Sequence, residues 1–151
     1  MTEAVPFEMT SLQLLRSLFQ RNRAWHEPPD GRISVATLTI RNTGDFSPEG
    51  GSARYVQGFR MEKAKDMPFS LEVEYGAVFS MSRPIPAADR DYYIHLAFPR
   101  LVFPFMREYI AETTRRGGFP PLMINMSVSP APRDGPSGAD GDPAPVLKWI
   151  H

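Results

Sequence analysis

The chain has 151 residues with 17 basic and 17 acidic side chains, a formal net charge of +0, and no cysteine. Its length predicts one domain with a sizeable core, and its neutral balance argues against a protein that holds nucleic acid through phosphate contacts. The absence of cysteine excludes disulfides, thiolate catalysis and cysteine-ligated metal sites. No apolar run approaches the roughly 20 residues of a membrane span, and the acidic N-terminus is unlike a signal peptide, so we expect a soluble, cytoplasmic protein.

Four strand-like segments are expected between residues 11 and 81. The last is the clearest, because apolar and polar side chains alternate along it, which is typical of a half-buried antiparallel strand. The second is rich in β-branched residues, which favour strands. Turn-forming residues lie between the segments at short intervals, and this spacing predicts a meander. The segments are centred on residues 12–19, 33–40, 55–61 and 69–75.

A long helix is predicted after the strands, because apolar residues recur at helical spacing over residues 102–113. Pro104 is expected in its first turn, where the missing N–H costs nothing. Two arginines and then Gly117 and Gly118 follow, which favours a helix end at this point. We expect the apolar residues 119–128 to be extended.

The C-terminal region changes in composition at residue 129. Residues 129–145 contain five prolines, three glycines and three aspartates but no large apolar residue, which predicts a disordered linker. The chain then ends on the apolar and basic peptide VLKWIH. We therefore expect a folded domain of residues 1–128, a linker of residues 129–145 and a terminal peptide of residues 146–151, which could tether a partner or fold back onto its own domain.

No pattern of catalytic or metal-ligating residues stands out. The three histidines have no ligand spacing to one another or to carboxylates, and Glu72 and Glu74 are expected on a solvated sheet face. We predict neither an enzyme nor a bound metal or cofactor. Eight methionines and ten phenylalanines leave apolar binding as the remaining kind of function, since methionine repacks around varied partners.

Two stretches resemble the SecB family of export chaperones. FSLEVEYGAVFSM at residues 69–81 resembles the last sheet strand of SecB, which has an E-V-x-x-G-x-F-S core. HLAFPRLVFPFMREYIAETTRRGGFPP at residues 95–121 is similar to the long-helix region of SecB, with its P-x-x-L-F-P-[YF]-x-R-E-x-I pattern followed by R-G-x-F-P. The matching positions include Pro99, Phe103, Pro104, Phe105, Arg107, Glu108, Ile110, Arg116, Phe119 and Pro120, with Val102 in place of leucine.

This resemblance implies an α+β fold, with a four-stranded antiparallel sheet, one long helix packed on one side and a disordered C-terminal tail. It also implies a homotetramer, built as a dimer of dimers, that binds unfolded polypeptides in an apolar groove without ATP and passes them to the SecA motor. The second helix of SecB has no counterpart after residue 128. The groove carried over to this chain consists of Ile33, Val35, Phe79, Leu101, Phe105 and Leu122.

The resemblance is weakest on the face that SecB proteins use to dock SecA. Glu72 matches one acid of that face, but its leucine position falls on Ser70, and this neutral chain differs from the strongly acidic family. Replaced acids weaken a charge-complementary interface, which argues against the usual SecA partner.

The first functional hypothesis is therefore a SecB-like, ATP-independent chaperone. It would bind non-native polypeptides as clients and hand them to a SecA-type or AAA+ motor. The alternative is a proteolytic adaptor that tethers its client to a ClpX-type AAA+ unfoldase through the terminal peptide, in particular Leu147, Lys148, Trp149 and Ile150. A chaperone dedicated to one antitoxin-like partner is a third possibility.

Overall fold

The computed structural model describes residues 4–27, 29, 38–63, 66–125 and 146–149. The predicted linker, Ile33, Val35 and Ile150 lie outside these described residues. The strands are β1 Phe7–Arg21, β2 Leu38–Phe46, β3 Ser52–Met61, β4 Phe69–Met81, β5 Leu122–Asn125 and β6 Val146–Trp149. The helical segments are η1 Ala87–Asp89, α1 Arg90–Tyr92, η2 Tyr93–Ala97 and α2 Phe98–Arg116.

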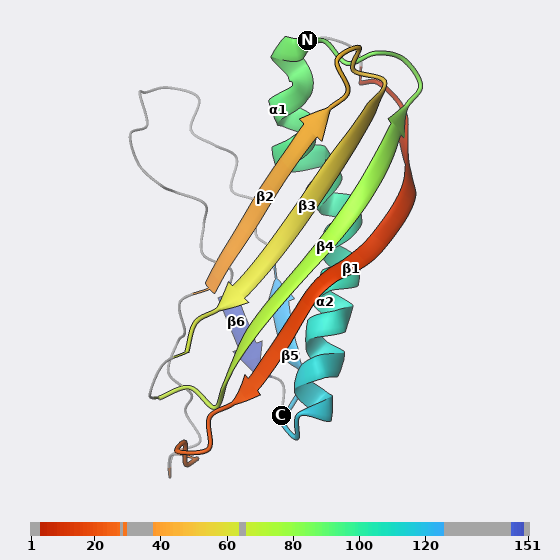
Figure 1. Cartoon of the computed structure of the whole chain (residues 1–151). Coiled ribbons are helices and arrows are strands. Elements are labelled where there is room, and N and C mark those ends of the chain that lie inside the picture. Colours follow the sequence, from red (N-terminus) through yellow and green to blue (C-terminus); the bar gives the residue numbers. More distant parts are fainter. Residues whose placement is uncertain (1–3, 28, 30–37, 64–65, 126–145, 150–151) are drawn as a thin grey trace, which may run out of the picture.

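The first four strands form one antiparallel sheet in the order β1-β4-β3-β2 (Figure 1). The predicted sheet and helix are confirmed, and β2, β3 and β4 form a meander. The meander prediction is wrong for β1, which pairs with β4 instead of β2. Residues 22–37 separate β1 from β2, and a connection of that length does not force its two strands into a hairpin, which needs about 2–5 loop residues.

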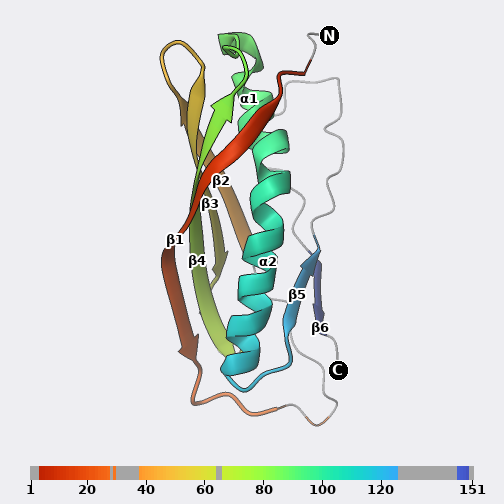
Figure 2. The same ribbon diagram turned by 90° about the vertical axis from the view of Figure 1, so that its right-hand side faces the viewer.

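Within the described residues, one face of the sheet is covered and the other is not. Odd-numbered residues of β4 and β3 are buried in alternation with more exposed even-numbered ones, as expected for strands packed on one side only. Helix α2 and the β5–β6 pair lie on the same side of the sheet (Figure 2). Figure 1 views the molecule from the uncovered side.

The long helix extends further towards the N-terminus than predicted. Helical segments follow one another from Ala87 to Arg116, and Pro104 lies inside α2 rather than in its first turn. The segment just before α2 is a five-residue π-helix in which the Phe98 N–H donates to the Tyr93 carbonyl. We attribute this wider turn to Pro99, whose ring has no N–H and would collide with the preceding turn of a regular α-helix.

Two apolar clusters fill the space between the sheet and the helix. The first surrounds Phe59, Leu71 and Ile110, and the second is an aromatic cluster in which the Phe79 and Phe98 rings stack with centroids 4.0 Å apart. Tyr75, which is partly buried, packs against both clusters. The aromatic cluster also contains Phe7, Phe46, Tyr55 and Tyr93.

A small polar group lies on the covered face of the sheet. Tyr55 donates a hydrogen bond to Asn42 Oδ1 at 2.5 Å, and the Gln57 amide donates to the same oxygen at 3.3 Å. Tyr55 and Gln57 are fully buried, and burial raises the pKa of the Tyr55 hydroxyl. The hydroxyl therefore stays neutral and keeps its proton for this bond.

Strand β5 is fastened to the end of α2. The Leu122 N–H donates to Thr114 Oγ1 at 2.9 Å, and Leu122 and Ile124 are fully buried in the first cluster. The helix ends as predicted, with Gly117 as its C-cap and Gly118 at a positive φ of 90°. β6 pairs antiparallel with β5, so that Leu122 lies opposite Trp149.

Candidate functional site

In the part of the chain that the structure describes, seven large apolar side chains are exposed, and they lie on β1, on β4 and on the helices. They are Leu14, Leu15, Leu18, Val78, Tyr92, Leu101 and Phe105. Residues directly opposite each other in an antiparallel sheet share a face. Leu14 pairs with Tyr75 on the covered face, whereas Leu18 pairs with Glu72 on the uncovered face. Leu14 and Leu18 therefore belong to two separate surfaces.

The first surface is a groove between β1 and the adjoining flank of α2, here called the β1–α2 groove. On the strand side of the groove, Leu14 is 42% exposed. On the helix side, Leu101 and Phe105 lie one helical turn apart and are 41% and 45% exposed. Two adjoining hollows follow this flank, the larger with a volume of about 470 Å³. Their shared lining residues are Tyr109, Glu112 and Arg116; Tyr75 and Phe105 line one hollow and Phe19 the other, whereas Leu14 and Leu101 line neither.

Two tyrosines form the inner wall of this groove. Tyr109 donates a hydrogen bond to Ser17 Oγ at 2.6 Å and thereby ties α2 to β1. Tyr75 and Tyr109 meet edge to face, with ring centroids 6.0 Å apart. Burial is the main cause that raises the pKa of the Tyr75 hydroxyl. The wall is thus aromatic and uncharged, and it suits apolar side chains of a bound chain.

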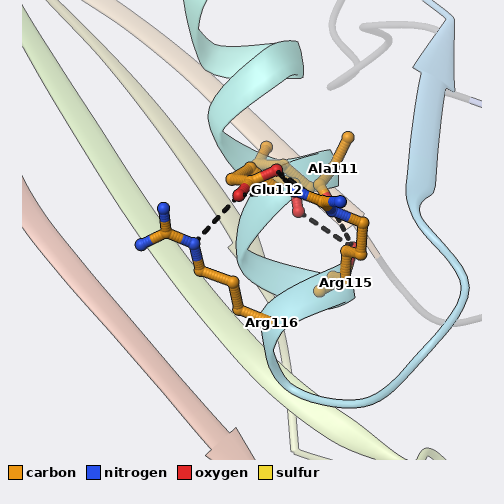
Figure 3. Close-up of polar contacts among 6 residues, drawn as sticks. Ala111, Glu112, Arg115 and Arg116 are labelled. Carbon is orange, nitrogen blue, oxygen red and sulfur yellow. Dashed lines mark hydrogen bonds and ion pairs between the residues drawn. The ribbon is translucent and has the colours of Figure 1, made fainter.

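A cluster of charges closes the C-terminal end of the groove (Figure 3). Glu112 accepts hydrogen bonds from Arg115 Nη2 at 2.6 Å and from Arg116 Nε at 2.9 Å. The Arg115 bond, followed by the Arg116 bond, lowers the pKa of the Glu112 carboxyl. Glu108 lines the same hollow, so its two acids and two arginines balance in formal charge.

The second surface is the uncovered face of the sheet. Leu15 and Leu18 are exposed here beside Glu72, whose carboxylate forms ion pairs with Arg16 at 2.9 Å and Arg60 at 3.2 Å. Leu15 is the extra residue of a β-bulge between Leu14 and Arg16, so its side chain turns towards Gly76 on this face. The acid expected to dock a partner is therefore already flanked by two arginines.

The structure separates the four residues of the predicted groove that it describes. Leu101 and Phe105 lie together on the exposed flank of α2. Phe79 and Leu122 are fully buried, the first stacked on Phe98 and the second in the other cluster, so neither is open to solvent in this arrangement. Both belong to the core because they lie on the covered face of their strands. Leu147, Lys148 and Trp149 lie in β6, paired through their backbone with β5.

Sequence reasoning missed Leu14, Phe19, Tyr75 and Tyr109 as groove residues. Tyr109 follows Leu101 and Phe105 at steps of four residues, and this spacing on one helical flank could have identified it. Leu14 and Phe19 could not have been found without knowing that β1 lies beside β4 and next to α2.

Within the described residues, no three histidine, cysteine, aspartate or glutamate side chains are grouped so as to hold a metal ion. No helix in the described part of the chain is long and apolar enough to cross a membrane.

Comparisons with known sequences agree on one family. Residues 56–127 match the family model of SecB, described as preprotein translocase subunit SecB. The protein-export protein SecB of Agrobacterium fabrum is 34% identical over 116 residues, which are 75% of this chain and 72% of that protein. SecB of Afipia carboxidovorans is 40% identical over 70 residues, and SecB of Brucella ovis is 46% identical over 61 residues. These two matches cover 42% and 37% of the relatives' length.

Solved structures share the fold. The Mycobacterium tuberculosis Rv1957 SecB-like chaperone, in complex with a ChAD peptide from the Rv1956 HigA1 antitoxin, superposes with a TM-score of 0.64 at 18% identity, over 80% of this chain and 90% of that chain. A Streptococcus agalactiae protein of unknown function superposes with a TM-score of 0.55 at 10% identity, over 82% of this chain and 99% of that chain. At these identities the likeness concerns the arrangement of strands and helix alone.

Proposed function

Because this chain belongs to the SecB family of export chaperones, we propose that it binds non-native polypeptides without ATP, in the cytoplasm, and passes them to a downstream machine. The observation that carries the proposal is the β1–α2 groove, where Leu14, Leu101 and Phe105 remain exposed on a folded domain. Because each side chain is already more than half-buried, covering its exposed part would gain about 1 kcal/mol, less than half of the value for complete burial. Several such contacts hold an extended chain, and each one alone is weak enough to release it.

Holding of this kind is a mass-action effect. A protein that binds the unfolded state of its client lowers the concentration that can aggregate, in proportion to its own concentration and affinity. Repeated grooves in a homo-oligomer would raise the affinity for a long client further, since one chain can occupy several of them. We propose a dimer or a tetramer.

Paired substitutions on the two exposed surfaces test this proposal. Leu101→Ser with Phe105→Ser removes the apolar side chains of the groove, and Leu15→Ser with Leu18→Ser makes the same change on the uncovered face. We expect the groove variant to lose at least about tenfold in its suppression of aggregation of a heat-unfolded enzyme, the equivalent of about 1.4 kcal/mol in binding. The uncovered-face variant should act like the unchanged protein.

Static light scattering on the same samples distinguishes loss of client binding from loss of assembly. A groove variant that keeps both its mass and its full suppression would contradict the proposal. Equal losses in both variants would also contradict it, because the groove would then have no special part.

The identity of the client is a narrower proposal. The Rv1957 neighbour is bound to a peptide from an antitoxin, so a dedicated client of that kind is a second candidate beside general export. Binding measurements with the antitoxin-type protein encoded nearest to this chain's gene would test it. A preference for unrelated unfolded proteins would reject it.

The adaptor alternative concerns the downstream machine. Its supporting feature is the VLKWIH peptide, which residues 126–145 connect to β5 and which must leave its pairing with β5 to reach an unfoldase. Deletion of residues 146–151 should abolish delivery of a bound client to an AAA+ unfoldase while client binding persists. Unchanged client turnover would reject the adaptor and leave SecA or another motor as the partner.

A further inference from the structure

The edge of β5 has the properties of a docking site for an extended peptide. Its backbone is positioned by the core, since Leu122 and Ile124 are fully buried and the Leu122 N–H is bonded to Thr114 Oγ1. Met123, between them, is only half-buried and alternates to the other face. The strand is therefore already extended and ordered before anything pairs with its edge.

The occupant of that edge is the chain's own C-terminal segment. β6 pairs antiparallel with β5 over four residue pairs, from Leu122 opposite Trp149 to Asn125 opposite Val146. Pairing of this kind satisfies backbone groups that an open edge would leave exposed. β-strand addition is also a general way in which proteins bind extended peptides.

The connection between the two strands makes this pairing replaceable. A stable hairpin has a loop of about 2–5 residues, whereas residues 126–145 join β5 to β6. A two-stranded ribbon is marginal in stability, and a segment held through a long connection competes at an effective concentration in the millimolar range. β6 therefore behaves as a tethered peptide ligand rather than as a fixed part of the domain.

We propose that β6 is an exchangeable occupant of the β5 edge and that an extended apolar segment of a client displaces it. This inference rests on the client-binding role proposed above. Val146-Leu147-Lys148-Trp149 is itself a short, mostly apolar sequence of the kind that a client would present. Because tail and client compete for one edge, a bound client excludes the tail, and a tail held elsewhere leaves the edge open to the client.

A disulfide lock tests the exchange, because the natural chain contains no cysteine. Met123 lies directly opposite Lys148, and directly opposite positions of antiparallel strands are close enough for a disulfide. The double variant Met123→Cys with Lys148→Cys holds β6 on β5 when oxidised and frees it when reduced. Deletion of residues 146–151 removes the occupant altogether. Lys148→Pro retains the full chain length but disfavours the pairing of β6, because proline removes one N–H from the strand.

The probe is a fluorescein-labelled VLKWIH peptide followed by fluorescence anisotropy. We expect the deleted and the Lys148→Pro proteins to bind it at least about tenfold more tightly than the unchanged chain. The oxidised double variant should bind it at least about tenfold more weakly than the unchanged chain, because its tail cannot leave the edge, and reduction should restore ordinary binding. Equal affinity in the deleted and unchanged proteins, or in the oxidised and reduced variants, would overturn the proposal.

A second measurement adds a permanently unfolded, carboxymethylated polypeptide to the complex of the deleted protein and the peptide. Displacement of the peptide supports competition at the β5 edge. An unfolded polypeptide that binds without displacing the peptide overturns this inference and leaves the proposed chaperone function intact. An unfolded polypeptide that binds none of the variants overturns the proposed function, and the inference with it.

Discussion

Phe98 and Phe105 lie two turns apart on α2 and illustrate two different regions of the molecule. Phe98 is fully buried and stacks on Phe79, with ring centroids 4.0 Å apart. Phe105 is 45% exposed in the β1–α2 groove. The same side chain in the same helix thus stabilises the fold at one position and offers surface to a partner at the other. Residues seven positions apart lie on nearly the same side of a helix, so the difference comes from their neighbours. Phe98 is enclosed by the rings of Phe7, Phe46 and Phe79, whereas Phe105 lines an open hollow.

The largest expected effect is at the buried member of this pair. Phe98→Ala should lower the free energy of unfolding by about 3–5 kcal/mol, because it removes a ring and leaves a cavity in the aromatic cluster. Urea denaturation followed by circular dichroism would measure the loss. Phe105→Ala is the matched control and should cost less than about 1 kcal/mol; similar losses in the two variants would remove the distinction between the regions.

The next effect tests whether β5 belongs to the stable region. Thr114→Val keeps the shape of the side chain but leaves the buried Leu122 N–H without its acceptor at 2.9 Å. We expect a loss of about 1–3 kcal/mol in the free energy of unfolding, with faster hydrogen exchange at Leu122. Thr114→Ser keeps the hydroxyl and should retain most of the stability. An unchanged exchange rate in the valine variant would show that this bond does not hold β5.

The smallest effect concerns the charged end of the groove and is a pH dependence. The hydrogen bonds from Arg115 and Arg116 lower the pKa of Glu112 from its ordinary value of 4.5. A carboxyl whose pKa is lower in the folded state stabilises that state above its ordinary pKa, and this contribution disappears as the pH falls through the lowered value. Glu112→Gln should therefore reduce the difference in thermal stability between pH 6 and pH 3.

The salt dependence of this effect is its control. Exposed ion pairs are screened by salt, so the unchanged protein and Glu112→Gln should converge in about 1 M NaCl. A difference that persists undiminished in salt would point to a packing effect of the substitution and not to the ion pairs of Glu112.

The elements with a local pattern were predictable. Alternation identified β4 from its own residues, and the spacing of apolar residues together with Gly117 and Gly118 located the end of α2. The start of α2 was harder to predict, because proline is common in a first helical turn but Pro104 lies within the helix. Whether a helix can accommodate a proline in its interior depends on the packing around it, and a local sequence pattern does not contain that information.

The candidate site was predictable only in part. Leu101 and Phe105 were anticipated and are exposed, whereas Phe79 and Leu122 were anticipated and are buried. All four are apolar residues in regular elements, so their type and spacing do not distinguish a core position from a groove position. Exposure depends on what packs against a side chain, and those neighbours come from distant parts of the sequence.

The sequence by itself determined the number and order of the main strands, the long helix and the membership in the SecB family. These depend on periodicity and on motifs of neighbouring residues. The tertiary structure alone decided that β1 pairs with β4, that Tyr109 ties α2 to Ser17, and that β6 occupies the edge of β5. Each of these is a contact between residues far apart in the chain, whose free energy depends on the burial and pairing that the whole fold creates.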